Sequence, residues 1–399
     1  MSAAADPARE PVVVAAVRTP VGRAFRGALR DVRADELAAT CLRAALARAS
    51  GVEPSEIDDV VLGCAIPEGP QGLNMARTAA LRAGLPVAVP ALTLTRFCAS
   101  GLEALVVAAD RIAAGRCRVV LAGGAESMSA VPMTGFRFLP NPALVAEMPQ
   151  AYVSMGMTAE EVAERHGVSR ADQDAFALAS HRKAVAAQDS GRFADELVPV
   201  DVVVRRVGAP GETVTATTRI DADEGPRRDT SAEALSALAP AFRKGGSVTA
   251  GNASQTSDGA AALLVTSRAF AAERGLDVLG VLRGYEVVGV APEVMGIGPV
   301  EALPRLLART GVAQHDVALF ELNEAFAAQA LAVQRALRIP DERLNVNGGA
   351  IALGHPLGAT GAKLCATLLH ELRRRDARYG VVTLCVGGGM GVAALFERT

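Results

Sequence analysis

Three residues of this chain place a reactive side chain in a setting that suits catalysis: Cys98, His355 and Cys385. Cys98 lies in the stretch "TRFCASGLEAL" (residues 95–105), directly before a run of small residues and the start of a helical pattern. The free N–H groups and the positive dipole end of a helix stabilise a thiolate. The sequence therefore predicts a nucleophilic cysteine with a lowered pKa at this junction.

The second reactive side chain is His355, in "LGHPLGATG". Glycine and proline neighbours are typical of a backbone that a ligand approaches closely. The other four histidines lie in charged or polar stretches, and we expect them to face solvent: His166, His181, His315 and His370. A cysteine with a histidine is the minimum set for an activated thiolate.

Cys385 ends an apolar run and precedes "VGGGMG", whose bare N–H groups suit an oxyanion site. Asn323 opens "NEAF" after another apolar run, where it either holds a water or caps the next helix. A protease-like triad of Cys98, His355 and Asn323 would leave Cys385 without a role. Two cysteines and one histidine instead suit acyl transfer, in which one thiolate takes an acyl group and the other thiol moves a proton on carbon.

The elements that must position these side chains follow an α/β alternation. Continuously apolar runs, typical of strands buried on both faces of a largely parallel sheet, cover residues 12–17, 60–64, 119–124, 261–267, 317–322 and 380–386. Amphipathic helices are expected over 35–50 and 101–114, each followed by a glycine.

Three segments in the N-terminal part of the chain resemble three segments in the C-terminal part, and the two sets occur in the same order. The pairs are 11–22 with 278–289, 56–69 with 314–327, and 96–127 with 352–391. This predicts two similar α/β halves. The stretch 127–249 has no counterpart, so we expect an inserted lobe. It carries a capping-box pattern from Thr158 to Glu161 and a helical pattern over 170–188 that Gly191 ends.

Composition excludes several classes of protein. The 399 residues are 50% hydrophobic with a formal net charge of −2, which gives no overall attraction to nucleic acid or to an anionic membrane. The N-terminus "MSAAADPARE" lacks the apolar core of a secretory signal. Six scattered cysteines without a C-x-x-C motif predict reduced thiols, with Cys41 and Cys365 in the core. A cytoplasmic location is expected.

Six motifs in order make the chain resemble the thiolase family over essentially its whole length: "RFCASGLEAL", "MGMTAEEVA", "SVTAGNASQTSDGAA", "NEAFAAQAL", "NGGAIALGHPLGATG" and "CVGGGMG". The resemblance implies an α/β thiolase fold, with two βαβαβαββ halves in a five-layered αβαβα arrangement. The expected units are 1–126 with 250–275 as the N-terminal half, 127–249 as an inserted loop domain that binds coenzyme A (CoA), and 276–399 as the C-terminal half.

The resemblance also implies roles for the reactive residues. Cys98 would be the acylated nucleophile, His355 would take its proton, and Cys385 would be the acid/base at the α-carbon of acetyl-CoA. Asn323, through a water, would stabilise one thioester oxygen together with His355. The backbone N–H groups of Cys98 and Gly387 would form the second oxyanion hole.

For CoA, the resemblance implies contacts from the inserted lobe and an acyl end lined by two further residues: Arg227, Phe242, Ala250 and Ser254, with Met155 and Phe326 at the acyl end. CoA is a substrate, and neither a permanently bound cofactor nor a metal is expected. Positive charge for its phosphates could come from Arg227, Arg228, Arg243 and Lys244, of which we expect at least two to be solvated surface residues.

The implied activity is that of an acetyl-CoA C-acyltransferase, which cleaves 3-ketoacyl-CoA with CoA into acetyl-CoA and a shortened acyl-CoA in β-oxidation. Ser154 stands where biosynthetic thiolases typically carry histidine, and segment 130–153 differs from their assembly loop, so the degradative branch is favoured. The alternatives are an acetoacetyl-CoA thiolase, a decarboxylating ketoacyl synthase, and a non-catalytic CoA- or lipid-binding relative. A homodimer or homotetramer is expected, and a β-oxidation partner enzyme stays open.

Overall fold

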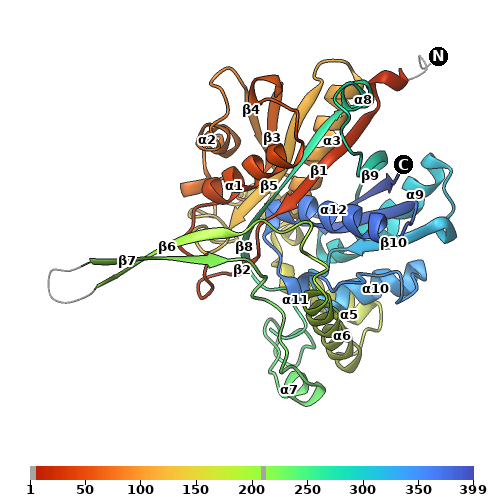
Figure 1. The fold of residues 1–399 in the computed structure, drawn as a ribbon. Helices are drawn as coiled ribbons and strands as arrows, with labels where there is room; N and C mark the ends of the chain where they lie inside the picture. Colours follow the sequence, from red (N-terminus) through yellow and green to blue (C-terminus); the bar gives the residue numbers. More distant parts are fainter. Residues whose placement is uncertain (1–5, 208–212) are drawn as a thin grey trace.

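The computed structural model of the protein describes residues 6–207 and 213–399 (Figure 1). Its centre is a ten-stranded sheet in the order β10-β11-β12-β9-β1-β8-β5-β3-β4, with β2 paired to β8. The strands of the first half are β1 (Pro11–Arg18), β2 (Gly22–Arg23), β3 (Asp59–Gly63), β4 (Ala91–Leu94), β5 (Val119–Ser127) and β8 (Ser257–Ser267). The strands of the second half are β9 (Gly280–Gly289), β10 (Val317–Leu322), β11 (Tyr379–Val386) and β12 (Met390–Glu397).

The two halves repeat one strand order. β3 is parallel to β5, which is antiparallel to β8, and β8 is antiparallel to β1. In the same way β10 is parallel to β11, which is antiparallel to β12, and β12 is antiparallel to β9. The halves meet where β1 pairs with β9 at Val12–Val281 and Val13–Gly280. The prediction of two similar α/β halves is confirmed.

The expectation of a largely parallel sheet is wrong, because most of the described strand pairs are antiparallel. Helices cover both faces of the strands regardless of pairing direction, and this burial makes the runs continuously apolar. Along β5, Leu121 packs into an outer cluster and its neighbour Val120 into a central one. Alternate side chains of a strand point to opposite faces, so both sets must be apolar.

The helices form three layers around the strands. The outer layers contain α1 (Ala34–Arg48) and α2 (Met75–Arg82) on the first half, and α9 (Gly298–Thr310) and α10 (Ala327–Leu337) on the second. The central layer is α3 (Ser100–Ala113) against α12 (Leu357–Arg374). α8 (Arg268–Glu273) and α11 (Ala350–Leu353) are short. Gly115 follows α3 with φ 70°, as expected for a helix-ending glycine.

α3 and α12 approach each other closely at their N-terminal ends. A Cβ on Gly101 would lie 2.8 Å from the backbone nitrogen of Ala362, and one on Gly361 would lie 2.4 Å from that of Leu102. Only glycine allows this approach. The contact brings the starts of the two central helices together, and Cys98 and His355 precede those starts.

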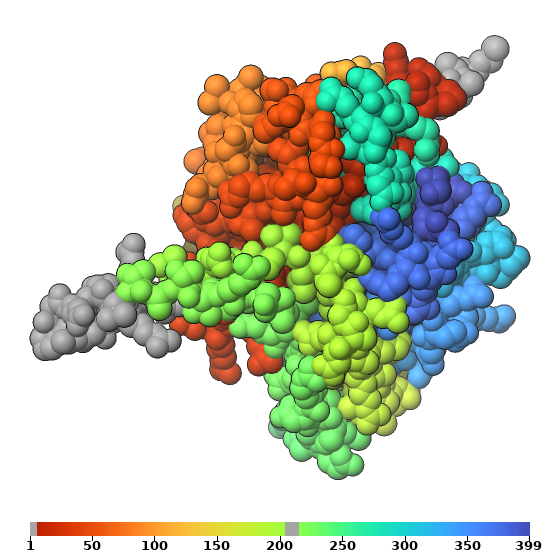
Figure 2. Space-filling model, viewed as in Figure 1, coloured from red at the N-terminus to blue at the C-terminus, as the bar shows by residue number. Residues whose placement is uncertain are grey.

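The segment between β5 and β8 holds α4 (Pro142–Glu147), α5 (Met155–Arg165), α6 (Arg170–Asp189), the paired strands β6 (Val200–Val207) and β7 (Thr213–Ile220), and α7 (Ala232–Ser236). Figure 2 shows this segment, yellow to green, lying across the lower side of both halves, while β6 and β7 project outward. α6 spans the predicted helix. Among the residues described, no helix is both long and apolar enough to cross a membrane.

The capping box expected from Thr158 to Glu161 is wrong. Thr158 lies inside α5, where its hydroxyl donates to the carbonyl of Met155. A capping box forms instead at the start of α6, between Ser169 and Asp172. The Thr-x-x-Glu spacing also occurs inside helices, so it marks a start only when the preceding backbone is extended.

Candidate active site

Cys98 lies in a short 3-10 turn, η4 (Phe97–Ala99), that leads into α3. Phe97 has a left-handed backbone (φ 43°), which is rare for a bulky residue and marks a constrained position. Ser100 stabilises the turn, since its hydroxyl donates to the carbonyl of Phe97 at 2.7 Å and accepts from the N–H of Arg96 at 2.8 Å. Ser100 therefore fixes the turn that carries Cys98.

Cys385 and Gly387 reach Cys98 from the end of β11. The N–H of Gly387 donates to the Cys98 sulfur. Cys385 is fully buried, and its proximity to Cys98 contributes to its raised pKa, after burial as the main cause. The turn between β11 and β12 is made by glycines, with φ 82° at Gly388 and 86° at Gly389. The structure thus brings both predicted thiols and the predicted oxyanion donor together.

Asn323 and His355 meet on the second half. Asn323 follows β10, and its side-chain Nδ2 lies 3.3 Å from Nε2 of His355. Its Oδ1 is buried and has no hydrogen-bond partner among the described residues, so it is available to a water or ligand. Asn323 does not cap the next helix, because Phe326 is the N-cap of α10.

The electrostatics of the resting site contradict the expected thiolate. Burial raises the pKa of Cys98 to about 11, although the N–H of Gly387 acts in the opposite direction. Burial, aided by the charge of Lys363, lowers the pKa of His355 to about 3. The lowered pKa predicted for Cys98 is therefore wrong, because desolvation outweighs the helix N-terminus. The resting pair is a neutral thiol and a neutral imidazole.

Two buried carboxylates that the sequence analysis did not single out hold this site. Glu126 accepts from the N–H of Ala65 at 2.7 Å and from that of Gly358, in the first turn of α12, at 2.8 Å. It therefore ties the first half to the start of the helix that follows His355. Glu324 accepts from the Ser180 hydroxyl at 2.7 Å and from the N–H of Ile351 at 3.2 Å. Glu126 and Glu324 each stand two residues after an apolar run, 119–124 and 317–322, and an acid placed so soon after a buried strand is the signal that would have found them.

Several residues assigned to the acyl end and to CoA gather on one side of Cys385. A Cβ on Gly387 would lie 3.6 Å from Met155 Sδ, and Met155, Phe326 and Cys385 share one apolar cluster. The ring of Phe242, which is 43% exposed, meets that of Phe326 edge to face at 6.0 Å.

Ser254 and Ala250 lie beside this cluster. Ser254 is half-buried, and its N–H donates to the carbonyl of Ala325 at 2.9 Å. Ala250 is exposed.

The four basic residues considered for the CoA phosphates divide into two pairs. Arg228 pairs with Asp189 at 2.6 Å, and Arg243 pairs with Glu164 at 2.9 Å, both near the surface. Arg227 and Lys244 are exposed and have no carboxylate partner among the residues described. The first two fit the expected solvated surface, and the second two remain available to an anion.

Two of the four remaining histidines do not face solvent, contrary to expectation. His181 is buried, accepts from the N–H of Arg227 at 3.2 Å, and has its pKa lowered to about 4 by burial. His370 is half-buried, and its Nε2 lies 2.9 Å from the carbonyl oxygen of Ala16. His166 and His315 are exposed as expected. A charged helical stretch does not exclude a buried position on its inner face.

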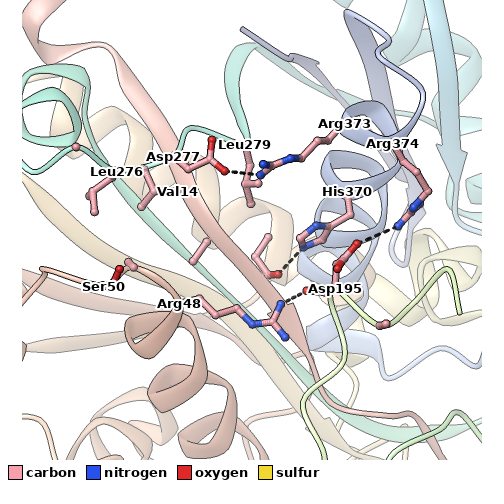
Figure 3. A pocket seen from close by; sticks show the side chains of 15 residues that line it. Val14, Arg48, Ser50, Asp195, Leu276, Asp277, Leu279, His370, Arg373 and Arg374 are labelled. Atoms are coloured by element: carbon pink, nitrogen blue, oxygen red, sulfur yellow. Dashed lines mark hydrogen bonds and ion pairs between the residues drawn. The ribbon is translucent and has the colours of Figure 1, made fainter.

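His370 lines a cavity of about 780 Å³ at the C-terminal end of α12 (Figure 3). Its arginines are engaged with neighbouring groups: Arg373 pairs with Asp277, and Arg374 pairs with Asp195 at 3.7 Å. None of the reactive residues lines it. His355 precedes the opposite end of the same helix, so this cavity is separate from the site around Cys98.

Family profiles described as "Thiolase, N-terminal domain" and "Thiolase, C-terminal domain" match residues 11–269 and 276–398. The chain is 54% identical to "3-ketoacyl-CoA thiolase" of Bacillus subtilis, covering 98% of this chain and 99% of the relative. It is 48% identical to "Acetyl-CoA acetyltransferase" of Pseudomonas aeruginosa, covering 97% and 99%. The crystal structure of human mitochondrial 3-ketoacyl-CoA thiolase in complex with CoA superposes with a TM-score of 0.88 at 39% identity, covering 98% and 99%.

Proposed function

This chain belongs to the thiolase family and is an acyltransferase of the 3-ketoacyl-CoA thiolase type, and on that premise we propose how its residues perform the reaction. The substrate is a 3-ketoacyl-CoA, and the products with CoA are acetyl-CoA and a shortened acyl-CoA. The observation that carries the proposal is the convergence of the Cys98 thiol, the Cys385 thiol and the Gly387 N–H beside the start of α3.

The first step breaks the bond between C2 and C3 of the substrate. Cys98 passes its proton to His355 and its sulfur attacks the C3 carbonyl carbon. The carbon–carbon bond breaks, the acyl group stays on Cys98 as a thioester, and the acetyl-CoA enolate takes a proton from Cys385. N–H groups of Cys98 and Gly387 stabilise one oxygen that becomes negative, and Asn323 with His355, through a water, stabilises the other.

The second step returns every proton. Free CoA gives its thiol proton to the Cys385 thiolate, and the CoA sulfur attacks the thioester carbonyl. The acyl group moves to CoA, and the Cys98 sulfur regains its proton from His355. The neutral Cys98 thiol and neutral His355 imidazole suit this order of steps, because the sulfur loses its proton only as it attacks the substrate carbonyl carbon.

We further propose that segment 127–249 grips CoA. The exposed side chains of Arg227 and Lys244 would meet its phosphates, and Phe242, whose ring meets that of Phe326, would flank its thiol-bearing arm. CoA contributes binding energy far from the reacting atoms, so the site needs tight chemistry only at the acyl end. Loss of CoA affinity on replacing Arg227 or Lys244, with the paired Arg228 as control, tests this assignment.

A homodimer or homotetramer is also part of the proposal. β4 ends the described sheet order, so one of its edges has no partner strand within the described chain. Leu73 and Leu92 are exposed nearby. An open edge with apolar side chains favours pairing with another copy. Light scattering on the purified protein tests this.

All six cysteines are unbridged, which suits work in the reducing cytoplasm, and we propose a role in β-oxidation there.

The experiment that tests the main proposal is mass spectrometry after mixing with acetyl-CoA. We expect one acetyl group on Cys98 in the unmodified enzyme. A non-catalytic CoA-binding protein would gain none. A 3-ketoacyl-CoA panel then separates the two thiolase branches, since an acetoacetyl-CoA thiolase would cleave acetoacetyl-CoA alone. Because some similar proteins are acetyl-CoA acetyltransferases, an acetoacetyl-CoA thiolase stays the alternative function.

A further inference from the structure

Thr360 is fully buried in the first turns of α12, five residues after His355. Its hydroxyl oxygen has two neighbours. One is Nδ1 of His355 at 2.6 Å, and the other is the carbonyl oxygen of Pro356 at 2.9 Å. Each neighbour constrains where the hydrogens of this group lie.

The Pro356 carbonyl can only accept a hydrogen bond, so in their 2.9 Å contact the Thr360 hydroxyl is the donor, as is common for a helical threonine and the carbonyl four residues before it. Towards His355 the same oxygen can then only accept. The donor of the 2.6 Å bond is therefore Nδ1–H of His355. A neutral imidazole has one N–H, so Nε2 carries a lone pair that can accept a proton.

Asn323 gives the same answer from the other side of the ring. Its side-chain Nδ2 is a donor only, and it lies 3.3 Å from Nε2 of His355. With the amide in this orientation, Nε2 is the acceptor. Burial and the charge of Lys363 lower the pKa of His355, which keeps the ring neutral near pH 7 and leaves the tautomer as the remaining variable.

We propose that Thr360 is a positioning residue that keeps the proton of His355 on Nδ1 and so leaves Nε2 as the base of the reaction. This rests on the proposed role of His355 in taking the Cys98 proton. Thr360 touches no substrate and acts only through the ring. Its side chain supplies the acceptor that the Nδ1–H needs in a buried place.

Loss of that acceptor has a specific consequence. A buried N–H without a partner is unfavourable, so the ring would move its proton to Nε2. Asn323 can accommodate this, because turning its amide presents Oδ1, which has no partner among the described residues. The base would then already hold a proton on the atom that has to accept one.

The tautomer can be measured directly in the unmodified enzyme. NMR of the protein labelled with ¹⁵N-histidine reports which ring nitrogen carries hydrogen, and the spectrum of His355→Gln identifies the signal. We expect Nδ1–H and a bare Nε2 near neutral pH. A proton on Nε2 in the unmodified enzyme would overturn the proposal, whatever the variants do.

Thr360→Val removes the acceptor at nearly constant volume, and Thr360→Ser keeps it. We expect Thr360→Val to move the proton to Nε2 and to lower kcat by about 100-fold with KM changed less than about threefold. Thr360→Ser should keep the tautomer and stay within about threefold of the parent kcat. Thr360→Val with normal kcat, or with Nδ1–H retained, contradicts the proposal.

Two results distinguish a failure of the proposal for Thr360 from a failure of the proposed role of His355. Full activity of His355→Gln would contradict the proposed role of His355 as the base, while the NMR result would still decide which ring nitrogen carries the proton. Poor folding of Thr360→Val would leave the unmodified enzyme and Thr360→Ser to decide, because a serine variant that folds but has Nε2–H also contradicts the proposal. Thermal unfolding of each variant separates a tautomer effect from a loss of stability.

Discussion

Gly101 of α3 lies directly against the backbone of α12, where an added Cβ would come within 2.8 Å of the nitrogen of Ala362. This contact sets the distance between the starts of the two central helices, and therefore between the residues that precede them, Cys98 and His355. The reaction depends on a packing contact that contains no reactive group.

Gly101→Ala is expected to separate these helix starts. Overpacking of this kind costs about 1–3 kcal/mol of the free energy of unfolding. We also expect kcat to fall more than KM rises, because misplaced reactive groups stabilise the transition state less while the contacts that bind CoA remain. Urea unfolding and steady-state kinetics measure both. Gly289→Ala is the matched control, since a Cβ added there would lie 4.0 Å from its nearest neighbour, the carbonyl oxygen of Gly389. Equal effects at both sites would show that the contact of Gly101 with α12 is not what positions the reactive residues.

The two thiols should differ in which step they support. Cys98→Ala is expected to give no acyl-enzyme with acetyl-CoA, because the nucleophile is absent. Cys385→Ala should still become acylated but lose thiolysis by about 100-fold or more, because no group protonates the enolate carbon. Mass spectrometry follows the first effect and thiolysis assays the second. Near-normal thiolysis by Cys385→Ala would contradict its role as the acid/base.

The alkylation of Cys98 is expected to depend steeply on pH. Its pKa is raised to about 11, so the thiolate fraction should rise about tenfold per pH unit from pH 7 towards 10. Initial rates of iodoacetamide labelling, read by peptide mass spectrometry, measure this. Cys41, buried and with its pKa raised to about 12, should react more slowly throughout. A rate for Cys98 that is already constant near neutral pH would indicate a preformed thiolate.

A buried ion pair should attach the inserted segment to β1. Arg18 is fully buried, its Nη1 lies 2.7 Å from Oδ1 of Asp223, and its Nε lies 2.6 Å from Glu196. Asp223→Asn leaves the guanidinium paired with Glu196 but weakens its hydrogen bonds to residue 223, and we expect a loss of about 1–3 kcal/mol in the free energy of unfolding. Asp189→Asn, which breaks the exposed pair with Arg228, should change it far less, because solvent screens that pair. Urea unfolding of both variants checks the difference.

Chain-length preference is expected to favour longer acyl groups. Ser154 is exposed at the N-cap of α5, and Met155, next along the chain, lies close to Gly387. Each methylene buried in an apolar groove contributes about 0.8 kcal/mol at most, so even partial burial of about four more methylenes should raise kcat/KM by about 10- to 100-fold. We expect 3-ketooctanoyl-CoA to exceed acetoacetyl-CoA, and Ser154→His to narrow the difference. A strict preference for acetoacetyl-CoA would place the enzyme in the biosynthetic branch.

Local sequence determined the elements and their order. The apolar runs predicted β1, β3, β5, β8, β10 and β11, and the glycines after the amphipathic stretches predicted the ends of α1, α3 and α6. The internal sequence repeat predicted two similar halves, because each copy has the same pattern of apolar residues to bury. These features depend on residues close together in the chain, so spacing and residue type are sufficient to find them.

Tertiary structure alone decided the properties that depend on distant contacts. The pKa of Cys98 is raised because packing buries it, and nothing near it in sequence measures that burial. His181 is inside because segment 223–227 folds over it, and the sheet is mixed because connections, rather than strand composition, set the direction of each strand. Sequence supplied the reactive side chains, and long-range packing set the charge and the neighbours that each one has in the folded protein.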